Sequence, residues 1–501
     1  MRIRKREEEE VGVMAPRSSV PAVTSSSSPA GGEDRVFTYS DLRKHTTSTD
    51  GWTCVDGSVY NITDFIENHP GGGIILTSLG RDASVLFETH HNLVDNKDKV
   101  VQLLSKYKIG TIAGYQPVAN YKTPFALELL KRVKVALKGV NRRDSIYAYT
   151  ASITVLSLFF LSIYIAYFTG NLYVAPLIGL VMALGHLAGH AGNHYSLSSN
   201  DLYNKFFSMM CTSLWGLREK NWEFSHLISH HCYNYTERDF ILEQHVPLNF
   251  FRVRESDEWK PIHTYQHFLY LTTPFTAFVI GFLRLDCAPF IFISPLLNAL
   301  RSNRKSPMPA PQFFASGSNC PTEALSIHED GVGPDKFVVF STNFHTAVSL
   351  FISNIVWLPL FLHTWSTHGL LHAVLLNGLA FGTQAMLVTK SLLTQHMCED
   401  IQLKPIYSST DDWYAMQVEA STTIKRPPVS LWLNFAISYQ TEHHMFPSLN
   451  PWALTLVQPV VQQVAKEFKV KYHYLPSEVA AIKSVFRQFK RMAAKPIGKK
   501  E

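Results

Sequence analysis

The chain has 501 residues, of which 46 are basic and 40 acidic, so it is only mildly basic. Its length predicts two folded units plus tails. The basic residues lie beside apolar segments rather than in nucleic-acid-binding runs, so we expect membrane-surface anchors and no nucleic-acid partner. The six cysteines form no CxxC pair and no framework spacing, which argues against a zinc knuckle or a disulfide scaffold and favours a reduced, cytosol-facing protein.

The N-terminal third contains a tail and then a compact segment. Residues 1–35 are charged and then rich in Ser and Pro, which predicts a disordered tail without a signal peptide. Residues 36–115 alternate strand-like and helical pieces between glycine turns, which predicts a small soluble domain. In it, His69 begins an HPGG turn and His91 follows 22 residues later, after Phe87. Two facing imidazoles can take both axial positions of a haem iron.

Residues 124–141 interleave apolar side chains with Lys and Arg, which predicts a basic amphipathic helix. We expect this helix at the membrane interface, within a linker over 116–146. An ordinary surface helix is the alternative.

Four apolar stretches predict transmembrane helices in two hairpins. Arg284 and Asp286 interrupt a further apolar segment, 268–297, which we expect to lie on the membrane or dip into it. Basic residues before the first span and after the last predict that both termini and the metal site face the cytosol. A flexible loop is expected over 298–335. The predicted hairpins are 147–168 with 172–189, and 337–362 with 369–389.

Histidines gather in three short clusters, HAGNH, HLISHH and QTEHH. An HxxxH pair on a helix points both imidazoles the same way, and histidine near a bilayer usually has a partner. The clusters hold more imidazoles than one tetrahedral zinc ion takes, so we predict two iron ions. The cluster members are His190, His194, His226, His230, His231, His443 and His444.

The stretch VYNITDFIENHPGG, followed by GRDAS and FETHH, resembles a cytochrome b5 domain over residues 36–112. The resemblance implies a haem b that is held by two histidines and carries one electron at a time. His69 matches the first ligand of that family. The spacing after the aromatic residue selects His91 as the second ligand, and His90 is the alternative because the loop is one residue shorter than usual.

From about residue 145 to residue 480 the chain resembles the front-end fatty acid desaturases, which are membrane enzymes with an N-terminal cytochrome b5 domain. The shared words are HAGNH, NW before HLISHH, DDWYAMQV and YQTEHHMFP. The resemblance implies that the seven box histidines bind iron and that His396 in LLTQHMCED supplies an eighth imidazole. Gln440, which this family has in place of a histidine, is expected to coordinate weakly or to orient a neighbour. His186 extends the face of the first box, and we interpret it as a packed residue rather than a ligand.

Two positions depart from the family pattern. Ala191 stands where the first box normally has Asp, so a hydrogen bond to a ligand is expected to be missing, and Ala191→Asp is expected to preserve or raise activity. The second box reads HxxxHH where HxxHH is usual. We expect positions i, i+4 and i+5 still to share a helix face.

The resemblance implies a small α+β haem domain followed by an all-α membrane desaturase domain over 147–480, with four transmembrane helices in two hairpins, a cytosolic cap and a basic tail over 481–501. The expected reaction uses O2, and electrons passed from haem to a di-iron centre, to insert a cis double bond near the carboxyl end of a fatty acyl chain. No catalytic side chain beyond the metal ligands is expected.

The expected partners are a fatty acyl lipid or acyl-CoA, an NADH-cytochrome b5 reductase and the endoplasmic reticulum membrane. A sphingoid-base desaturase, a lipid hydroxylase and an inactive haem-bearing electron carrier are the alternatives. The sequence leaves open the position of the double bond, the chain length and head group of the substrate, the oligomeric state and a plastid location.

Overall fold

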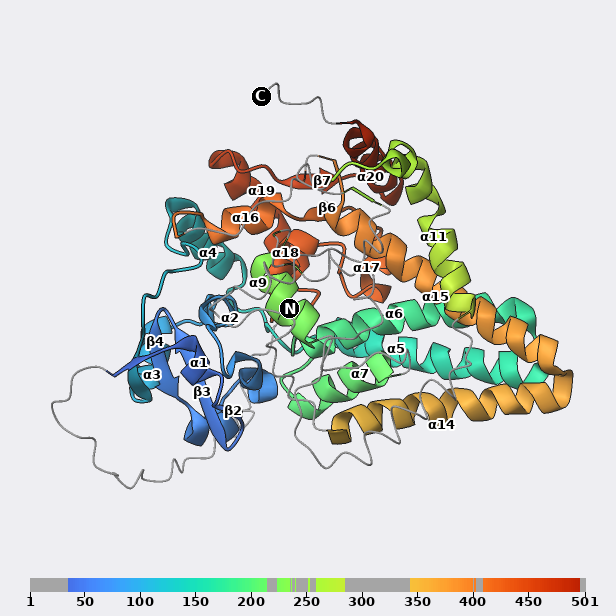
Figure 1. Cartoon of the computed structure of the whole chain (residues 1–501), viewed down its shortest axis with the longest axis horizontal. Coiled ribbons are helices and arrows are strands. Elements are labelled where there is room, and N and C mark those ends of the chain that lie inside the picture. The colour runs from blue at the N-terminus through green and yellow to red at the C-terminus, as the bar shows by residue number, and fades with distance from the viewer. Residues whose placement is uncertain are drawn as a thin grey trace, which may run out of the picture.

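Three parts make up the described chain (Figure 1): a small domain with a sheet at the lower left, long helices at the right, and a layer of shorter helices above them. The computed structural model describes residues 35–213, 223–234, 236, 239, 251–252, 258–283, 343–399, 401 and 409–495. The predicted tail 1–35, except residue 35, and the predicted loop 298–335 lie outside this range.

The small domain is built on a five-stranded sheet with strand order β1-β5-β4-β3-β2. β1 pairs in parallel with β5, and the other neighbours are antiparallel. Asp56 and Gly57 both have positive φ, which gives the tight turn that joins β3 to β4. The strands are β1 (Val36–Phe37), β2 (Thr46–Thr47), β3 (Asp50–Val55), β4 (Ser58–Asn61) and β5 (Lys108–Ile112).

Short helices complete this domain and hold its two histidines. The side chain of Thr38 accepts a hydrogen bond from the backbone N–H of Asp41, and that of Asn96 accepts one from Lys99, so both residues cap helix starts. The helices are α1 (Tyr39–Leu42), η1 (Thr63–Asn68), η2 (Gly72–Ser78), α2 (Ser84–His91) and α3 (Lys97–Ser105). The prediction of a small domain of mixed α and β structure is confirmed.

Helix α4 (Pro124–Ala136) corrects one prediction. Its apolar face, which includes Phe125, Leu129 and Val133, is buried in a core shared with α16 and α19. Because protein covers this face, it is not available to enter a membrane. The structure therefore supports the alternative, an ordinary surface helix, and not the predicted interfacial helix.

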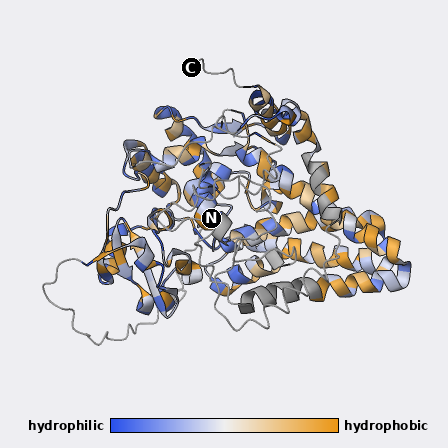
Figure 2. Cartoon of the chain, in the orientation of Figure 1, coloured by the Kyte–Doolittle hydropathy of each residue, from blue (hydrophilic) through white to orange (hydrophobic). Residues whose placement is uncertain are grey.

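Long helices form the right half of the molecule, and hydrophobic residues dominate α5, α6 and α15 (Figure 2). Among the described residues, three segments are long and apolar enough to cross a membrane: Ile146–Phe168, Leu172–Asn193 and Leu370–His396. The two helices of the first predicted hairpin are present and pack against each other. Helices α14 and α15 are separated only by Gly369 and pack against each other, as a second hairpin requires. The elements are α5 (Ile146–Ile163), η3 (Tyr164–Phe168), η4 (Leu172–Val174), α6 (Ala175–Asn193), α7 (Asp201–Ser213), α14 (Asn343–His368) and α15 (Leu370–His396).

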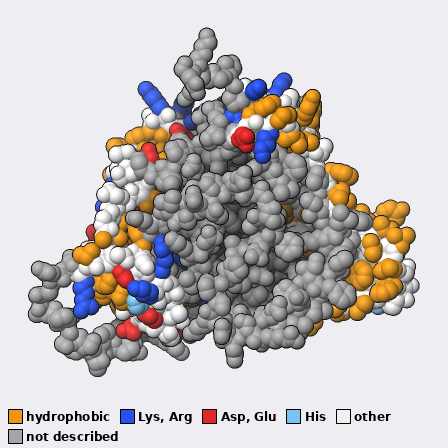
Figure 3. Space-filling view, viewed as in Figure 1, with side chains coloured by type: hydrophobic (Ala, Val, Ile, Leu, Met, Phe, Trp, Pro, Cys, Tyr) orange, Lys and Arg blue, Asp and Glu red, His pale blue; other side chains and the backbone are white. Residues whose placement is uncertain are grey.

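Close packing joins α6 to α15. A Cβ on Gly179 would lie 2.3 Å from the carbonyl oxygen of Ala380, so only glycine permits this approach. The free end of the helices is apolar at the surface (Figure 3), where Tyr164, Phe168 and Leu371 are exposed. In the same view, Lys and Arg side chains lie along the top of the molecule, near α20. This division of apolar and basic surface fits a membrane protein.

Helix α11 (Gln266–Leu283) is the described part of the apolar segment that the sequence left ambiguous. It starts beside α20 and packs along α15, where Phe278 lies against Gly382 near the middle of that helix. This course follows the bundle inward, as a segment that dips into the membrane would. Residues 284–297 lie outside the described range.

A layer of short elements covers the ends of α6 and α15 where the histidine boxes lie. It contains a two-stranded parallel sheet of β6 and β7, and it shares a core with the small domain. Its elements are η5 (Glu223–His230), α9 (His231–Tyr233), η7 (Pro261–Tyr265), α16 (Trp413–Glu419), β6 (Thr422–Ile424), α17 (Pro428–Leu433), α18 (Gln440–Met445), α19 (Leu454–Glu467), β7 (His473–Leu475) and α20 (Glu478–Ala493).

Candidate metal centre

The first histidine box lies at the C-terminal end of α6. His190 is in the last turn of the helix, and His194 caps it, with its backbone N–H donating to the carbonyl oxygen of His190. The HxxxH spacing brings the two rings to 4.8 Å between centroids. His186, one turn earlier, is buried but belongs to neither group of converging histidines, which agrees with its interpretation as a packed residue.

The first five residues of the second box lie on a π-helix, η5, and its last histidine, His231, begins the short α-helix α9. A π-helix bonds residue i to i+5 and winds more slowly than an α-helix with its roughly 3.6 residues per turn. Positions i+4 and i+5 therefore flank position i, as i+3 and i+4 do in an α-helix. The wider turn thus accommodates the extra residue of the HxxxHH spacing, and His226, His230 and His231 all face the centre.

The third box occupies the short helix α18, which begins at Gln440. His443 and His444 lie in its last turn, and both are buried. His396 reaches the same place from the C-terminal end of α15. Five separate elements, α6, η5, α9, α15 and α18, and the residue after α6 thus meet at one buried point.

Five imidazoles form the larger of two groups. Their potential ligand nitrogens all lie within 4.8 Å of one another. The Nε2 atom of His226 lies 2.6 Å from Nε2 of His190 and 3.1 Å from Nε2 of His231. Such close ring nitrogens face a common point, as the ligands of one metal ion do. The members are His190, His194, His226, His231 and His443.

The second group contains His230, His396 and His444, whose ligand nitrogens also lie within 4.8 Å of one another. The amide of Gln440 lies between two of them, 3.0 Å from Nε2 of His396 and 3.1 Å from Nε2 of His444. Rotating that amide by half a turn directs its oxygen to the same point. The rings of His231 and His444 stack at 4.3 Å between centroids, so the two groups adjoin.

The donor set fits metal ions that accept imidazole nitrogen. Burial lowers the pKa of His443 to about 3 and those of His194, His231 and His444 well below the ordinary value, so these rings are neutral. Among the described residues, both ring nitrogens of His194 and the Nε2 atom of His443 are buried without a hydrogen-bond partner. Metal coordination would satisfy these atoms, and eight imidazoles exceed what one ion takes.

Two carboxylates lie at the site: Asp239, which no motif contains, and Glu442, which is part of the third box QTEHH. Asp239 accepts a hydrogen bond from Nδ1 of His230 at 2.9 Å, which fixes the ring so that Nε2 faces the second group. Glu442 is buried beside His443 and accepts hydrogen bonds from Thr423 and Tyr472. Burial raises the pKa of Glu442 to about 7. Neither contact is visible in the sequence, because the fold creates both.

Ala191 departs from the family pattern, and its surroundings differ accordingly. It is 4% exposed and belongs to an apolar cluster that includes Leu197 and Phe207. Its carbonyl oxygen accepts two hydrogen bonds from Ser196. The position is therefore packed as a small apolar residue.

The small domain brings His69 and His91 to 6.2 Å between ring centroids. With metal–nitrogen bonds of about 2 Å and ring centres roughly 1 Å behind each nitrogen, two axial imidazoles lie about 6 Å apart. The Nδ1 atoms of both rings bond backbone carbonyl oxygens, of Gly72 and of Phe87, which leaves each Nε2 for a metal. Burial lowers the pKa of His91 to about 4, so the ring is neutral. The pair therefore fits a haem iron.

The small domain that contains His69 and His91 packs directly on the metal centre. Val85 and Leu86 of α2 share one core with Leu227 and Ile228 of the second box. On the other side of α2, Asn92 donates hydrogen bonds to Tyr414 and to the backbone of Met445, which follows the third box. The two centres are thus joined by a packed protein interface.

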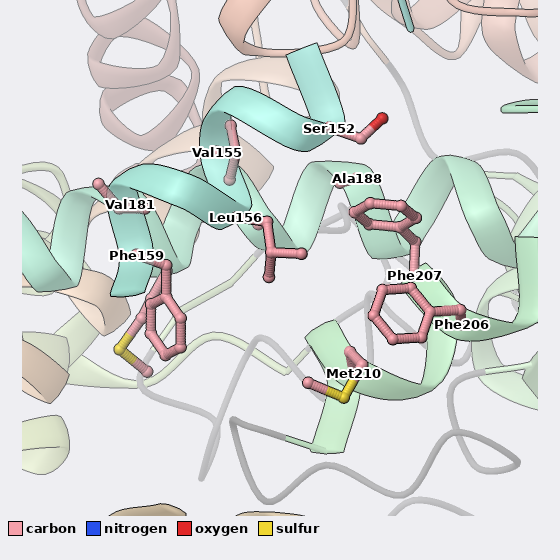
Figure 4. Close-up of a pocket in the computed structure, with 11 residues that line it drawn as sticks. Ser152, Val155, Leu156, Phe159, Val181, Ala188, Phe206, Phe207 and Met210 are labelled. Atoms are coloured by element: carbon pink, nitrogen blue, oxygen red, sulfur yellow. The ribbon is translucent and has the colours of Figure 1, made fainter. Parts of the chain in front are cut away.

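An apolar cavity lies between α5, α6 and α7 (Figure 4). Its volume is about 30 Å³, and it opens to the outside. Val155 and Phe159 from α5, Val181 from α6 and Phe207 from α7 line it. Its one hydroxyl, on Ser152, donates to a backbone carbonyl oxygen, so the wall is apolar.

The sequence of this chain was compared with profiles of known protein families. The profile of the fatty acid desaturase family matches residues 166–476, which is more than half of the chain. The chain belongs to the fatty acid desaturase family. A second profile, the cytochrome b5-like haem/steroid binding domain, matches residues 38–113 of this desaturase. The protein is therefore an oxidoreductase that combines a cytochrome b5-like domain with a desaturase domain, as the sequence predicted.

Curated relatives of this desaturase match nearly its whole length. The acyl-lipid (8-3)-desaturase B of Dictyostelium discoideum is 26% identical over 92% of this chain and 95% of its own. The Delta(5) fatty acid desaturase A of the same organism has the same identity and the same coverage. The Delta(8)-fatty-acid desaturase 1 of Arabidopsis thaliana is 25% identical over 88% of this chain and 89% of its own. The recognition of a front-end desaturase from the sequence is thereby confirmed.

Proposed function

We propose that this desaturase inserts a cis double bond near the carboxyl end of a fatty acyl chain bound to a lipid. The gathering of eight histidines and Gln440 into two adjoining buried groups, beside a paired-histidine haem site, carries this proposal. The relatives named for Delta(5), Delta(8) and acyl-lipid desaturation support both the bond position and the lipid substrate.

We assign one iron ion to each group of histidines. His190, His194, His226, His231 and His443 would hold the first, and His230, His396, His444 and Gln440 the second. When bound, the irons supply the O2-dependent oxidation that removes hydrogen from an unactivated methylene. Asp239 keeps the His230 ring in orientation, and the burial of the whole set keeps bulk water away.

The acyl chain would enter along α6. The apolar cavity includes Ala188 in its wall, two residues before His190 on the same helix. A wall without free polar groups suits a hydrocarbon chain and excludes water. We therefore propose that this cavity holds part of the acyl chain.

The proposed topology has four transmembrane helices in two hairpins, with α14 as the fourth, and a cap that faces the cytosol. The two boxed helix ends, those of α6 and α15, lie on the same side, and Arg142 and Arg143 precede the first span there. Basic residues at this side favour the cytosol under the positive-inside rule. We place the protein in the endoplasmic reticulum membrane, with NADH-cytochrome b5 reductase as the electron donor to the haem of His69 and His91.

The test is expression in yeast fed single fatty acids, with products identified by gas chromatography and mass spectrometry. We expect a new double bond in a fatty acid from the wild-type protein and none from His444→Ala. The matched control is His363→Ala, which changes a histidine on α14 that is in neither group. A hydroxylated product or an unsaturated long-chain base would assign the chain to an alternative lipid reaction, and a protein with haem but no other iron would be an electron carrier.

A further inference from the structure

One amide side chain connects the cytochrome b5-like domain to the third histidine box. Asn92 directly follows His91 and is only 3% exposed. Its Nδ2 atom donates a hydrogen bond to the carbonyl oxygen of Met445 at 3.2 Å. The residues are 353 positions apart in the chain, so the fold alone creates this contact.

The two ends of this hydrogen bond are each covalently next to a proposed ligand. Asn92 is the chain neighbour of His91, and Met445 is the chain neighbour of His444. Met445 and His444 are fully buried. A continuous path of covalent bonds and one hydrogen bond therefore runs from one ligand to the other without crossing solvent.

We propose that Asn92 is a positioning residue that couples the haem to the metal centre for electron transfer. The inference rests on the proposed function, because it requires both ligand sets. His69 and His91 would hold the haem and His444 belongs to the accepting centre; with both groups bound, one electron and no proton would pass from the first to the second, and a reduced nicotinamide-dependent reductase would replace that electron.

His90 is the competing residue, and its contacts form no such path. Its Nδ1 atom bonds the carbonyl oxygen of Leu86 at 2.9 Å and lies 3.2 Å from the hydroxyl of Thr89, both on its own helix. Its Nε2 atom is buried without a hydrogen-bond partner among the described residues. His90 lies near His194, but no hydrogen bond between them is formed. The hydrogen bonds of His90 therefore stay on α2 and join it to no described residue of the metal centre.

A substitution at Tyr414 distinguishes two roles of Asn92: coupling the two centres for electron transfer, and only holding the two domains together. Asn92 donates to its hydroxyl at 3.0 Å, and that hydroxyl lies 3.3 Å from a carboxylate oxygen of Glu88, one turn earlier on α2. Tyr414→Phe therefore weakens the contact between the domains but leaves the hydrogen bond from Asn92 to Met445 in place. If Asn92 only held the domains together, the two substitutions would have similar effects.

The experiment uses the purified full-length protein with haem and iron bound. A photoreductant reduces the haem in a flash, and its absorbance then reports the rate of reoxidation under anaerobic conditions. We expect Asn92→Leu to slow this rate about tenfold or more. The haem spectrum, the haem reduction potential and the content of non-haem iron should stay unchanged. Tyr414→Phe and His90→Phe should transfer electrons close to the wild-type rate.

Asn92→Ala is the second variant, in case the larger side chain prevents folding. A normal rate in a folded Asn92 variant would overturn the inference, and so would equal slowing in Asn92→Leu and Tyr414→Phe. Slow transfer in His90→Phe with normal transfer in Asn92→Leu would move the path to His90. If the wild-type haem is not reoxidised at all, the proposed function fails instead, because the haem would not serve this centre.

Discussion

At the scale of single residues, the end of α2 shows how neighbouring side chains take different roles. His91 faces His69 at the separation that two axial ligands require. The Nδ1 atom of His90 bonds the carbonyl oxygen of Leu86 on its own helix. This geometry favours His91 over His90 as the second haem ligand, and the assignment stays a prediction.

We expect His91→Ala to abolish haem binding, because it removes one of two axial ligands, and His90→Ala to retain it. The measurement is the reduced haem spectrum of the purified protein, together with its non-haem iron content, which should be unchanged in both variants. Retention of haem in His91→Ala and its loss in His90→Ala would reverse the assignment.

Ala191→Asp is expected to destabilise the protein, in contrast to the expectation from the sequence alone. The carboxylate would enter an apolar cluster beside Phe207, at a cost of about 3 kcal/mol or more if it stays charged and unpaired. We expect a lower Tm and loss of iron. Ala191→Ser, which adds a smaller and uncharged group, is the control. A gain in activity in Ala191→Asp with Tm unchanged would show that the carboxylate finds a ligand to orient.

Motif spacing singled out seven of the eight histidines that the fold brings into the two groups, and the family resemblance added His396. Motif spacing did not divide the histidines between two ions, since that division depends on how α6, α15 and α18 meet. Asp239 was missed for a different reason. An aspartate nine residues after His230 has no fixed direction relative to it until the intervening chain has folded.

At the scale of elements, α4 shows that the sequence pattern of an amphipathic helix does not reveal what covers its apolar face. A stripe of apolar residues with flanking lysines is the same whether lipid or protein covers it. Here α19 and α16 cover it, and Arg132 at its edge forms ion pairs with Glu128 and Glu467. Only knowledge of the rest of the core could have decided between the two surroundings.

Leu156→Trp is expected to reduce desaturation of long acyl chains more than that of short ones, because the indole would fill part of the cavity between α5 and α6. Leu156 is only partly buried, so the protein should fold and keep both haem and iron. Leu158→Trp is the control, because Leu158 lies on the same helix, is 38% exposed and does not line the cavity. The measurement is product yield across a series of chain lengths. Equal yields from Leu156→Trp and Leu158→Trp would contradict the proposed path of the acyl chain.

At the scale of the whole molecule, the cytochrome b5-like domain shares a hydrophobic core with the desaturase domain and is not joined to it by a flexible linker alone. The order of the two domains followed from the sequence, because each carries its own motifs. Their docking did not, because residues such as Asn92 and Met445 lie far apart in the chain. The shared core includes Leu86, Leu93, Leu227 and Phe446.

We expect the two domains to unfold together. Separation would expose the shared apolar core to water, so each domain stabilises the other. The measurement is thermal unfolding followed by haem absorbance and by far-ultraviolet circular dichroism, which should give coincident midpoints. A haem transition well below the helical transition would show that the small domain comes away first.

The π-helix of the second box has a consequence for comparing these enzymes. An added residue in an α-helix rotates everything beyond it by roughly 100° about the axis. Here the wide turn of Glu223–His230 takes up the extra residue, so His226, His230 and His231 still converge. Two enzymes whose boxes differ in length by one residue can therefore share one arrangement of ligands. A comparison based on the number of residues between the histidines would place two such enzymes in different groups. A comparison based on the positions of the imidazole rings would place them together.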